Sequence, residues 1–342
     1  MVAGRNPLRS LRQVVRTHRG TAPQIVAALR ARPAPPVDRG PDVDRPATDA
    51  LHARLTPADL ASIEAALEGN LALLWAQAGE GERRYLALLC AAWYRLPDAL
   101  EHTGLSAAVP PEDVHAMARG PLAAGGDPGL ADLVLRALTA SRVPLASGAR
   151  VLDFGCSSGR GVRVLAAARP DVTWLGCDPN PEAIAWAGSH LPGVEWFTSP
   201  NAPPLPLDDG TLDVAYAISI WSHFAPGPAR AWLDEMHRLI RPGGALVLTV
   251  HGLDTIAHHL RGGHASPLEV TEITTSLLRG EVHFDDVFAG RGDWGVHDPG
   301  WGNAYLTLDW LAPRVTPAWS ITLAESGGLQ GVQDVVVLRR ES

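Results

Sequence analysis

The sequence predicts an α/β fold, in which a doubly wound parallel sheet follows a helical N-terminal extension. From residue 149 onward, short apolar runs alternate with segments of helical periodicity, which is typical of βαβ units. Before that residue, apolar positions recur only at helical spacing. The chain has 342 residues, 46% hydrophobic and 19% charged, so it is long and apolar enough for a sizeable core. A wholly disordered or fibrous protein is thereby excluded.

The first 50 residues are expected to be a basic arm followed by a proline-rich linker, both flexible. Residues 1–37 contain seven arginines and no acidic residue, and the five prolines between Pro33 and Pro46 exclude a helix or a central strand. The sequence leaves the partner of the arm open between a membrane surface, an anionic carrier and another protein. A frayed end without a partner is the alternative.

Residues 51–127 are expected to form the helical extension, which would cap the domain that follows. Thr56 and Asp59 have the spacing of a capping box, with Pro57 at the first helical position. Another helix is expected over residues 86–93.

The main domain is assigned to residues 128–342. It is expected to open with a helix over 130–138. Apolar runs then predict seven strands: 149–154, 172–177, 194–197, 212–219, 245–250, 318–325 and 332–340. Three helices fit between the first five strands: 161–168, 181–190 and 228–240.

The strongest functional signal is the segment VLDFGCSSGRG at residues 151–161. It places Asp153 at the end of a strand, and Gly155 and Gly159 before a helix. Parallel sheets bind ligands beyond the carboxyl ends of their strands, where glycines let a ligand approach the N–H groups of a helix N-terminus. Asp178 ends the next strand, where a carboxylate accepts hydrogen bonds from ribose hydroxyls. The two signals together predict a nucleotide-type pocket.

This segment resembles the first motif of class I S-adenosylmethionine-dependent methyltransferases, with Ser157 in place of the middle glycine. Residues 203–224 and 235–252 look like the fourth-strand and fifth-strand motifs of the same superfamily, and the resemblance covers residues 128–252. It implies a seven-stranded Rossmann-like methyltransferase sheet that ends in an antiparallel hairpin, with S-adenosyl-L-methionine as the cofactor.

The resemblance also implies roles for the matching residues. Four residues of the first motif would hold the methionine moiety: Asp153, Gly155, Ser157 and Gly159. Asp178 would bind the ribose, and Asn201 would bind the adenine unless it is a plain turn residue. Three residues after the fourth strand would line the pocket beside the methyl group: Ser219, Ile220 and Trp221.

Two histidines are the candidate catalytic residues. His223 and His251 both follow the carboxyl ends of strands, where a base that takes a proton from a hydroxyl acceptor would lie. The alternative is that they are merely packed or solvated histidines. Three further histidines lie close together in the sequence: His258, His259 and His264. No cysteine lies near them, so a solvent-facing loop is expected there rather than a metal site, and no metal is predicted.

The 11 tryptophans are expected mostly in the core. One or two are candidates for a stacking face toward a sugar or planar acceptor, above all in residues 300–305.

These patterns favour a bacterial methyltransferase that acts on a small molecule or sugar. Oxygen is favoured over nitrogen as the acceptor atom, because the histidines offer a base. A catalytically silent S-adenosylmethionine-binding scaffold or regulatory module is the alternative. A nicotinamide-dependent oxidoreductase is disfavoured, since Ser157 and Arg160 depart from its glycine fingerprint.

Charge and cysteine content bear on partners and location. The 29 basic and 37 acidic residues give a net charge of −8, which argues against nucleic-acid binding. No apolar run reaches the roughly 20 residues of a transmembrane helix. Three cysteines behind an N-terminus unlike a secretory signal indicate free thiols and a cytoplasmic protein.

Overall fold

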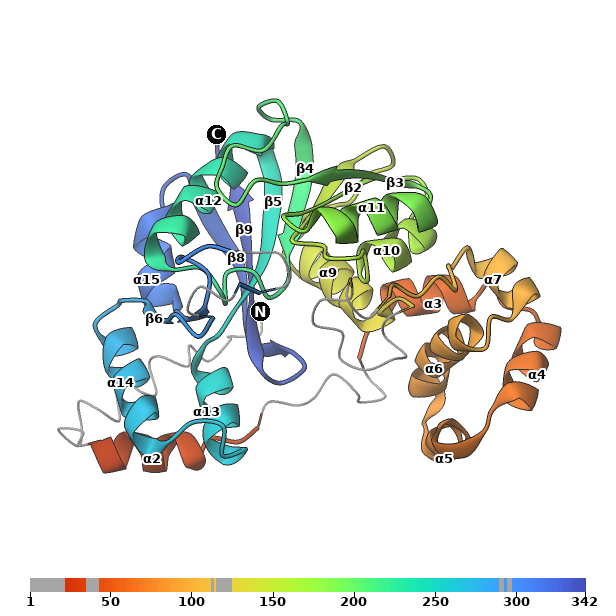
Figure 1. Cartoon of the computed structure of the whole chain (residues 1–342), viewed down its shortest axis with the longest axis horizontal. Coiled ribbons are helices and arrows are strands. Elements are labelled where there is room, and N and C mark those ends of the chain that lie inside the picture. The colour runs from red at the N-terminus through yellow and green to blue at the C-terminus, as the bar shows by residue number, and fades with distance from the viewer. Residues whose placement is uncertain (1–21, 35–42, 112–113, 115–124, 289–291, 294–296) are drawn as a thin grey trace.

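A seven-stranded sheet lies between two layers of helices in the computed structural model, and a helical extension projects to one side of it (Figure 1). The structure describes residues 22–34, 43–111, 114, 125–288, 292–293 and 297–342. The order of the strands in the sheet is β3-β2-β1-β4-β5-β9-β8, which confirms the predicted fold class. Their bounds along the chain are β1 Arg150–Phe154, β2 Thr173–Asp178, β3 Val194–Thr198, β4 Leu212–Ala217, β5 Ile240–Val250, β8 Trp319–Leu329 and β9 Gln333–Arg340.

The sheet changes direction at its last two strands. Strands β1 to β5 are parallel to their neighbours, whereas β9 runs antiparallel to β5 and β8 antiparallel to β9. The late antiparallel hairpin is thus confirmed. Strand β4 ends two residues earlier than predicted, so that Ile218 and Ser219 already belong to the loop after it.

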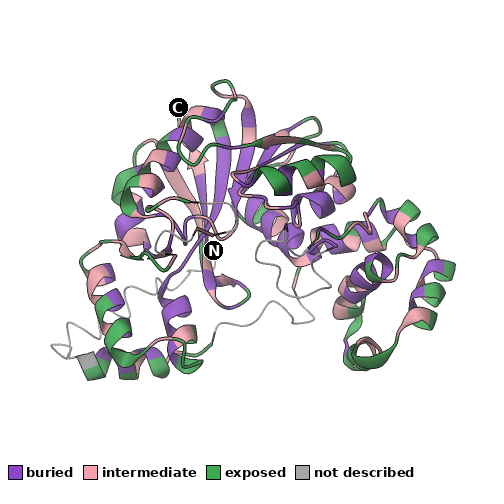
Figure 2. Ribbon diagram, in the orientation of Figure 1, coloured by how far each residue is buried: buried purple, intermediate pink, exposed green. Residues whose placement is uncertain are grey.

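Each face of the sheet is covered by helices, and the central strands are buried between them (Figure 2). One face packs against α12 (Pro226–Leu239) and α15 (Leu308–Val315). The other packs against three helices: α3 (Pro46–His52), α9 (Pro128–Ala140) and α10 (Val162–Ala168). A further helix, α11 (Pro181–His190), packs on β2 and β3.

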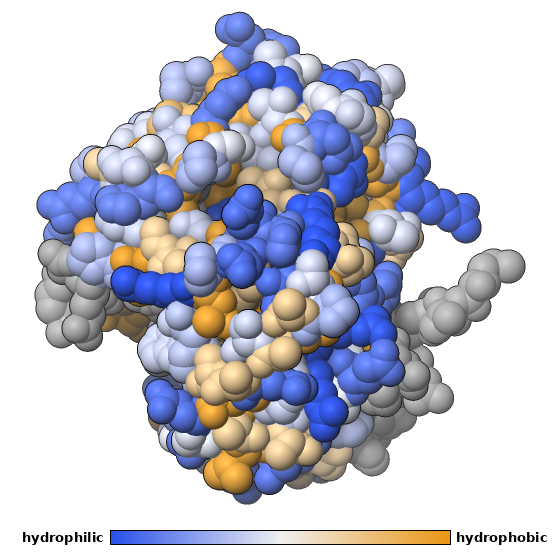
Figure 3. Space-filling view, turned by 90° about the vertical axis from the view of Figure 1, so that its right-hand side faces the viewer, coloured by the Kyte–Doolittle hydropathy of each residue, from blue (hydrophilic) through white to orange (hydrophobic). Residues whose placement is uncertain are grey.

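The helical extension has a small core of its own. Its helices are α4 (Pro57–Ala66), α5 (Gly69–Gln77), α6 (Glu80–Trp93) and α7 (Pro97–Thr103). The predicted capping box is present at the start of α4, where Thr56 Oγ1 accepts from the N–H of Asp59 and the Asp59 carboxylate accepts from the N–H of Thr56. Ile63, Ala87 and Cys90 pack together behind it. Figure 3 views this side of the molecule and shows apolar patches among polar surface.

Two segments of the first 50 residues are helical, where a flexible arm and linker were expected. Helix α2 (Ala22–Arg30) buries Ile25 and Leu29 against helices α13 (Leu253–Arg261) and α14 (Pro267–Leu278). The five arginines between residues 5 and 19, and most of the linker, lie outside the described residues.

Helix α3 begins before the expected start of the folded part. Its first N–H groups are satisfied because the carboxylate of Asp132 in α9 accepts from Ala47 at 2.8 Å and from Thr48 at 2.9 Å. Asp132, in the expected main domain, thereby binds residues of the expected N-terminal linker. The division of the chain into domains stays a prediction.

The solvent-facing loop expected at His258, His259 and His264 is present only at His264, which is exposed after helix α13; the other two histidines lie on that helix. Residues 253–261 form helix α13, whose apolar side chains face the core at helical spacing. His259 lies on this helix with its Nδ1 atom 3.2 Å from the Tyr305 hydroxyl, and burial lowers its pKa, assisted by His258 and His264. Among the described residues, no three potential ligands come together in a way that would hold a metal ion.

A two-stranded ladder lies beside α14. It pairs β6 (His283–Asp285) with β7 (Asn303–Tyr305). The part of the chain that the structure describes contains no helix with the length and apolar character needed to cross a membrane.

Candidate functional site

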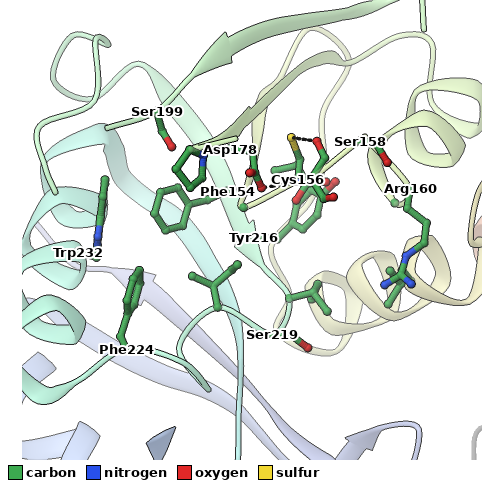
Figure 4. Close-up of a pocket in the computed structure, with 18 of the residues that line it drawn as sticks. Phe154, Cys156, Ser158, Arg160, Asp178, Ser199, Tyr216, Ser219, Phe224 and Trp232 are labelled. Carbon is green, nitrogen blue, oxygen red and sulfur yellow. Dashed lines mark hydrogen bonds between the residues drawn. The ribbon is translucent and has the colours of Figure 1, made fainter. Parts of the chain in front are cut away.

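A cavity lies at the carboxyl ends of β1, β2 and β4 (Figure 4). This is the edge at which open parallel sheets bind ligands. Seven of the predicted cofactor residues line it: Asp153, Gly155, Ser157, Asp178, Asn201, Ser219 and Ile220. The structure therefore brings together residues that lie far apart in the sequence.

The first glycine of the loop after β1 has no room for a side chain. Gly155 has a φ of +79°, and a Cβ atom there would overlap Cδ1 of Ile220. Gly159, which ends the loop, has a φ of +78°, and its Cβ would lie 2.5 Å from the Trp196 ring. Both positions therefore require glycine, for backbone conformation and for space.

Ser157 occupies the place of the middle glycine and keeps a glycine-like backbone. Its φ is +50°, in the left-handed region, and its N–H donates to Asp178 Oδ2 at 2.8 Å. The Ser157 hydroxyl is buried at the cavity and has no hydrogen-bond partner among the described residues. A buried hydroxyl without a partner is costly, so this atom suits a polar ligand group.

Two carboxyl groups give the cavity an acidic end. Burial raises the pKa of Asp153 to about 7, and the negative charge of Asp178 adds to this shift. Burial also raises the pKa of Asp178, while N–H donors from Asn180 and Ser157 oppose the shift. A bound cation would lower the pKa of both carboxyl groups, because its positive charge favours their ionised forms.

Aromatic side chains form another part of the wall. Phe154, Phe224, Trp232 and Trp301 all line the cavity. Phe154 and Trp232 have ring centroids 4.6 Å apart, and Phe224 meets Trp301 edge-on at 5.4 Å. The indole N–H of Trp232 is buried without a hydrogen-bond partner among the described residues. Trp301 thus lies where a stacking face was predicted.

The predicted position of Trp221 at the pocket wall is wrong. Its side chain is fully buried in the core, and its indole N–H donates to the carbonyl of Ala229 in α12 at 3.2 Å. The loop turns between Ile220 and Trp221, so the two neighbours point to opposite sides of it.

The candidate catalytic histidines lie beside each other behind the aromatic wall. The ring centroids of His223 and His251 are 5.9 Å apart, and His223 stacks on Trp301 at 4.8 Å. His223 Nδ1 lies 2.7 Å from the Gly302 carbonyl, which only accepts, so this nitrogen carries a proton. Among the described residues, Trp301 rather than either histidine lines the cavity.

Several lining residues come from segments that carry no sequence motif. Leu329 reaches the cavity from the end of β8 and Gln330 from the turn that follows it. Asp293 reaches it beside Trp301 and accepts a hydrogen bond from the indole N–H of that residue at 2.8 Å. Gln333 lies behind the wall and donates to Ser219. Of these lining residues, the sequence indicated only Trp301, because it is an aromatic residue in a tryptophan-rich segment.

Comparisons with known proteins agree on one domain. Residues 151–244 match the family described as "Methyltransferase domain". The trans-aconitate 2-methyltransferase of Methylobacterium nodulans is 34% identical over 122 residues, which are 35% of this chain and 45% of that protein. The malonyl-[acyl-carrier protein] O-methyltransferase of Pseudescherichia vulneris is 29% identical over 172 residues, 48% of this chain and 61% of that protein.

The chain spans less than half the length of the first curated relatives that it matches. Among solved structures, an S-adenosylmethionine-dependent methyltransferase from Methanosarcina mazei is similar with a TM-score of 0.42 and 19% identity, over 58% of this chain and 94% of that one.

Proposed function

We propose that this chain, whose residues 151–244 match the methyltransferase-domain family, transfers a methyl group from S-adenosylmethionine to a small molecule. The match supports the family resemblance of the sequence, and S-adenosylmethionine is the cofactor that this resemblance implies. The observation that carries the proposal is the joint placement of Asp153, Gly155, Ser157 and Asp178 around one cavity.

The residues present fit this cofactor. Asp153, Gly155, Ser157 and Gly159 would hold its methionine moiety, with the Ser157 hydroxyl bonding the carboxylate. Asp178 would accept from the ribose hydroxyls, and Asn201 would contact the adenine. Ser219 and Ile220 would lie beside the methyl group. When bound, the cofactor supplies an electrophilic methyl group on a sulfonium cation, which suits the acidic cavity.

We infer that the acceptor binds against the aromatic wall and presents an oxygen atom. This expectation rests on His223, whose Nδ1 proton is held by the Gly302 carbonyl, so that the lone pair of the neutral ring is on Nε2. Its ring stacks on Trp301, next to the aromatic wall. We expect His223→Ala to lower turnover about 100-fold, as for a lost general base, and to leave cofactor affinity unchanged. Full turnover by that variant would remove the base from the mechanism.

The proposal includes a location and a set of partners. A cytoplasmic protein without nucleic-acid partners is supported by the net charge of −8 and by free thiols at Cys90, Cys156 and Cys177. Burial raises the pKa of all three thiols, which makes them poor nucleophiles.

Calorimetric titration with S-adenosylmethionine, S-adenosylhomocysteine and NADH tests the proposal. We expect the first two ligands to bind and NADH not to bind. Asp178→Ala should lose at least about tenfold in affinity, since it removes a buried acceptor of hydrogen bonds. Asp171→Ala, which removes an exposed carboxylate bound to Arg169, is the control. A folded protein that binds neither adenosyl ligand would refute the cofactor, and binding without turnover of any acceptor would favour the silent module.

A further inference from the structure

A buried polar network connects the cavity wall to His251. Ser219 lies on the wall after β4, Thr249 comes from β5, and Gln333 comes from β9. Thr249 is fully buried, and Gln333 and His251 are more than nine-tenths buried. Strands β5 and β9 and the loop after β4 thus contribute to one network, and no sequence motif indicates it.

The direction of each hydrogen bond follows from one backbone group. The N–H of Ser219 can only donate, and it points to Thr249 Oγ1 at 2.7 Å. The Thr249 hydroxyl therefore directs its own proton elsewhere, and Gln333 Oε1 lies 2.7 Å away to accept it. With Oε1 facing Thr249, the carboxamide nitrogen of Gln333 faces the other way and donates.

Two acceptors receive the protons of this nitrogen. Gln333 Nε2 lies 2.9 Å from Ser219 Oγ and 3.4 Å from His251 Nε2. If His251 Nε2 accepts this proton, the neutral ring carries its own proton on Nδ1. Because Ser219 Oγ accepts, the proton of the Ser219 hydroxyl remains to be donated.

The backbone of Ser219 is held in an unusual conformation. Its φ is +61°, a left-handed value that residues other than glycine rarely adopt. Thr249 and Gln333 fix both its N–H and its hydroxyl, so the surrounding structure over-determines this residue. Such strain at a cavity wall is typical of a ligand-contacting residue. In Figure 4, Ser219 lies on the lower side of the cavity, below Tyr216 and opposite Ser199.

We propose that Gln333 is a positioning residue, which holds the Ser219 hydroxyl as a hydrogen-bond donor to the methyl acceptor and holds His251 as its Nδ1-protonated tautomer. The part that concerns the acceptor rests on the proposed function, whereas the tautomer does not. His251 then serves as a partner of Gln333 in the network, and His223 remains the candidate base. The acceptor must carry an oxygen or nitrogen lone pair that faces Ser219.

The tautomer is tested first, because it needs no ligand. NMR spectra of protein with ¹⁵N-labelled histidine report which ring nitrogen carries the proton, and the signals lost in His251→Gln assign the ring. We expect His251 in the wild type to be protonated on Nδ1 and unprotonated on Nε2. A wild-type ring protonated on Nε2 alone overturns the proposal without any variant of Gln333.

Substitution of Gln333 should invert this pattern. In Gln333→Glu the carboxylate only accepts, so His251 should become protonated on Nε2. Gln77→Leu, which changes an exposed glutamine at the end of α5, should leave the His251 signals unchanged. An unchanged His251 signal in Gln333→Glu contradicts the positioning role. If Gln333→Glu fails to fold, Thr249→Val replaces it, since loss of the hydroxyl frees the carboxamide to rotate and should mix the tautomers.

The role toward the acceptor is tested by separating cofactor binding from turnover. Ser219→Ala should bind S-adenosylhomocysteine with an affinity within about threefold of the wild type. A tenfold loss would assign the hydroxyl to the cofactor and overturn this part of the proposal. With an acceptor that the wild type methylates, Ser219→Ala and Gln333→Leu should raise KM for that acceptor about tenfold. Absence of turnover by the wild type would instead count against the proposed function, while the binding and NMR results still decide the inference.

Discussion

Two separate features of the structure require glycine at position 155: the positive φ and the lack of space for a side chain. Gly148 is a control that separates the two. Gly148 has nearly the same φ, +78°, but nothing lies within 4 Å of a Cβ built there. We expect Gly155→Ala to destabilise the protein by about 1 to 3 kcal/mol more than Gly148→Ala, because only the first meets Ile220. Urea denaturation of both variants measures the difference.

Cofactor binding should follow the same contrast. Displacement of Ile220 into the cavity would lower the affinity of Gly155→Ala for S-adenosylhomocysteine, whereas Gly148→Ala should bind like the wild type. Equal stability and equal affinity in the two variants would show that Ile220 moves aside freely and that the close contact has no consequence.

The carboxyl group of Asp153 should make cofactor binding depend on pH. Its pKa lies at about 7 in the free protein because of burial, and a bound sulfonium cation would favour the charged form. Affinity for S-adenosylmethionine should therefore rise between about pH 6 and pH 8. S-adenosylhomocysteine lacks the sulfonium charge and should show a flatter profile. Calorimetry at both pH values, with Asp153→Asn expected to flatten the profile, checks this. A steeper dependence for S-adenosylhomocysteine would contradict it.

The residues that sequence reasoning located and those it missed differ in how they reach the cavity. Asp153, Gly155 and Asp178 lie at strand ends, where topology alone places them at the ligand edge. Gln333 reaches Ser219 only because β9 lies beside β5 in the sheet, a pairing between distant segments. Trp221 shows the opposite error, since a single turn in a loop decides which side chain faces the cavity and no periodic pattern records it.

At the level of elements, helix α2 shows why a short helix escapes sequence analysis. Nine residues are too few for a helix that is stable by itself, and the basic, proline-rich surroundings indicate an arm. The stabilising partner lies in helices α13 and α14, against which Leu29 is fully buried. Arg32 adds an ion pair with the buried Asp254 of α13. The same tertiary contacts explain why α13 is a helix where a loop was expected.

Removal of the Leu29 side chain tests whether α2 is part of the folded domain. We expect Leu29→Ala to lower the free energy of unfolding by about 2 to 4 kcal/mol, the usual cost of a truncated core leucine. Arg30→Ala, on the exposed side of the same helix, should change it by less than about 0.5 kcal/mol. Urea denaturation provides both values. Equal stability of the two variants would show that residues 22–30 do not contribute to the folded domain and behave as the flexible arm that the sequence predicts.

Across the whole molecule, two strands of the sheet, β1 and β9, carry acids with the same titration range. Asp153 lies at the cavity, and Asp334 lies on β9 near Asp254 and Arg32. Burial raises the pKa of both to about 7, and the charge of Asp254 adds to the shift at Asp334. Folding therefore favours the neutral form of both carboxyl groups. As a result, the free energy of unfolding of the whole protein should depend on pH.

The sign of that response follows from proton linkage. A carboxyl group with a raised pKa holds its proton longer in the folded state, so its contribution to stability is complete below the unfolded pKa of 3.8 and falls as pH rises through about 7. Between pH 6 and pH 8, Asp334 alone should remove about 1 kcal/mol from the free energy of unfolding. Asp334→Asn cannot ionise and should lose that much less over the same interval, whereas Asp98→Asn, at an exposed position of α7, should follow the wild type. Urea denaturation at both pH values gives the comparison. If Asp334→Asn and the wild type lose stability in parallel, the Asp334 carboxyl is already ionised in the folded protein, and its charge must be balanced by Arg32.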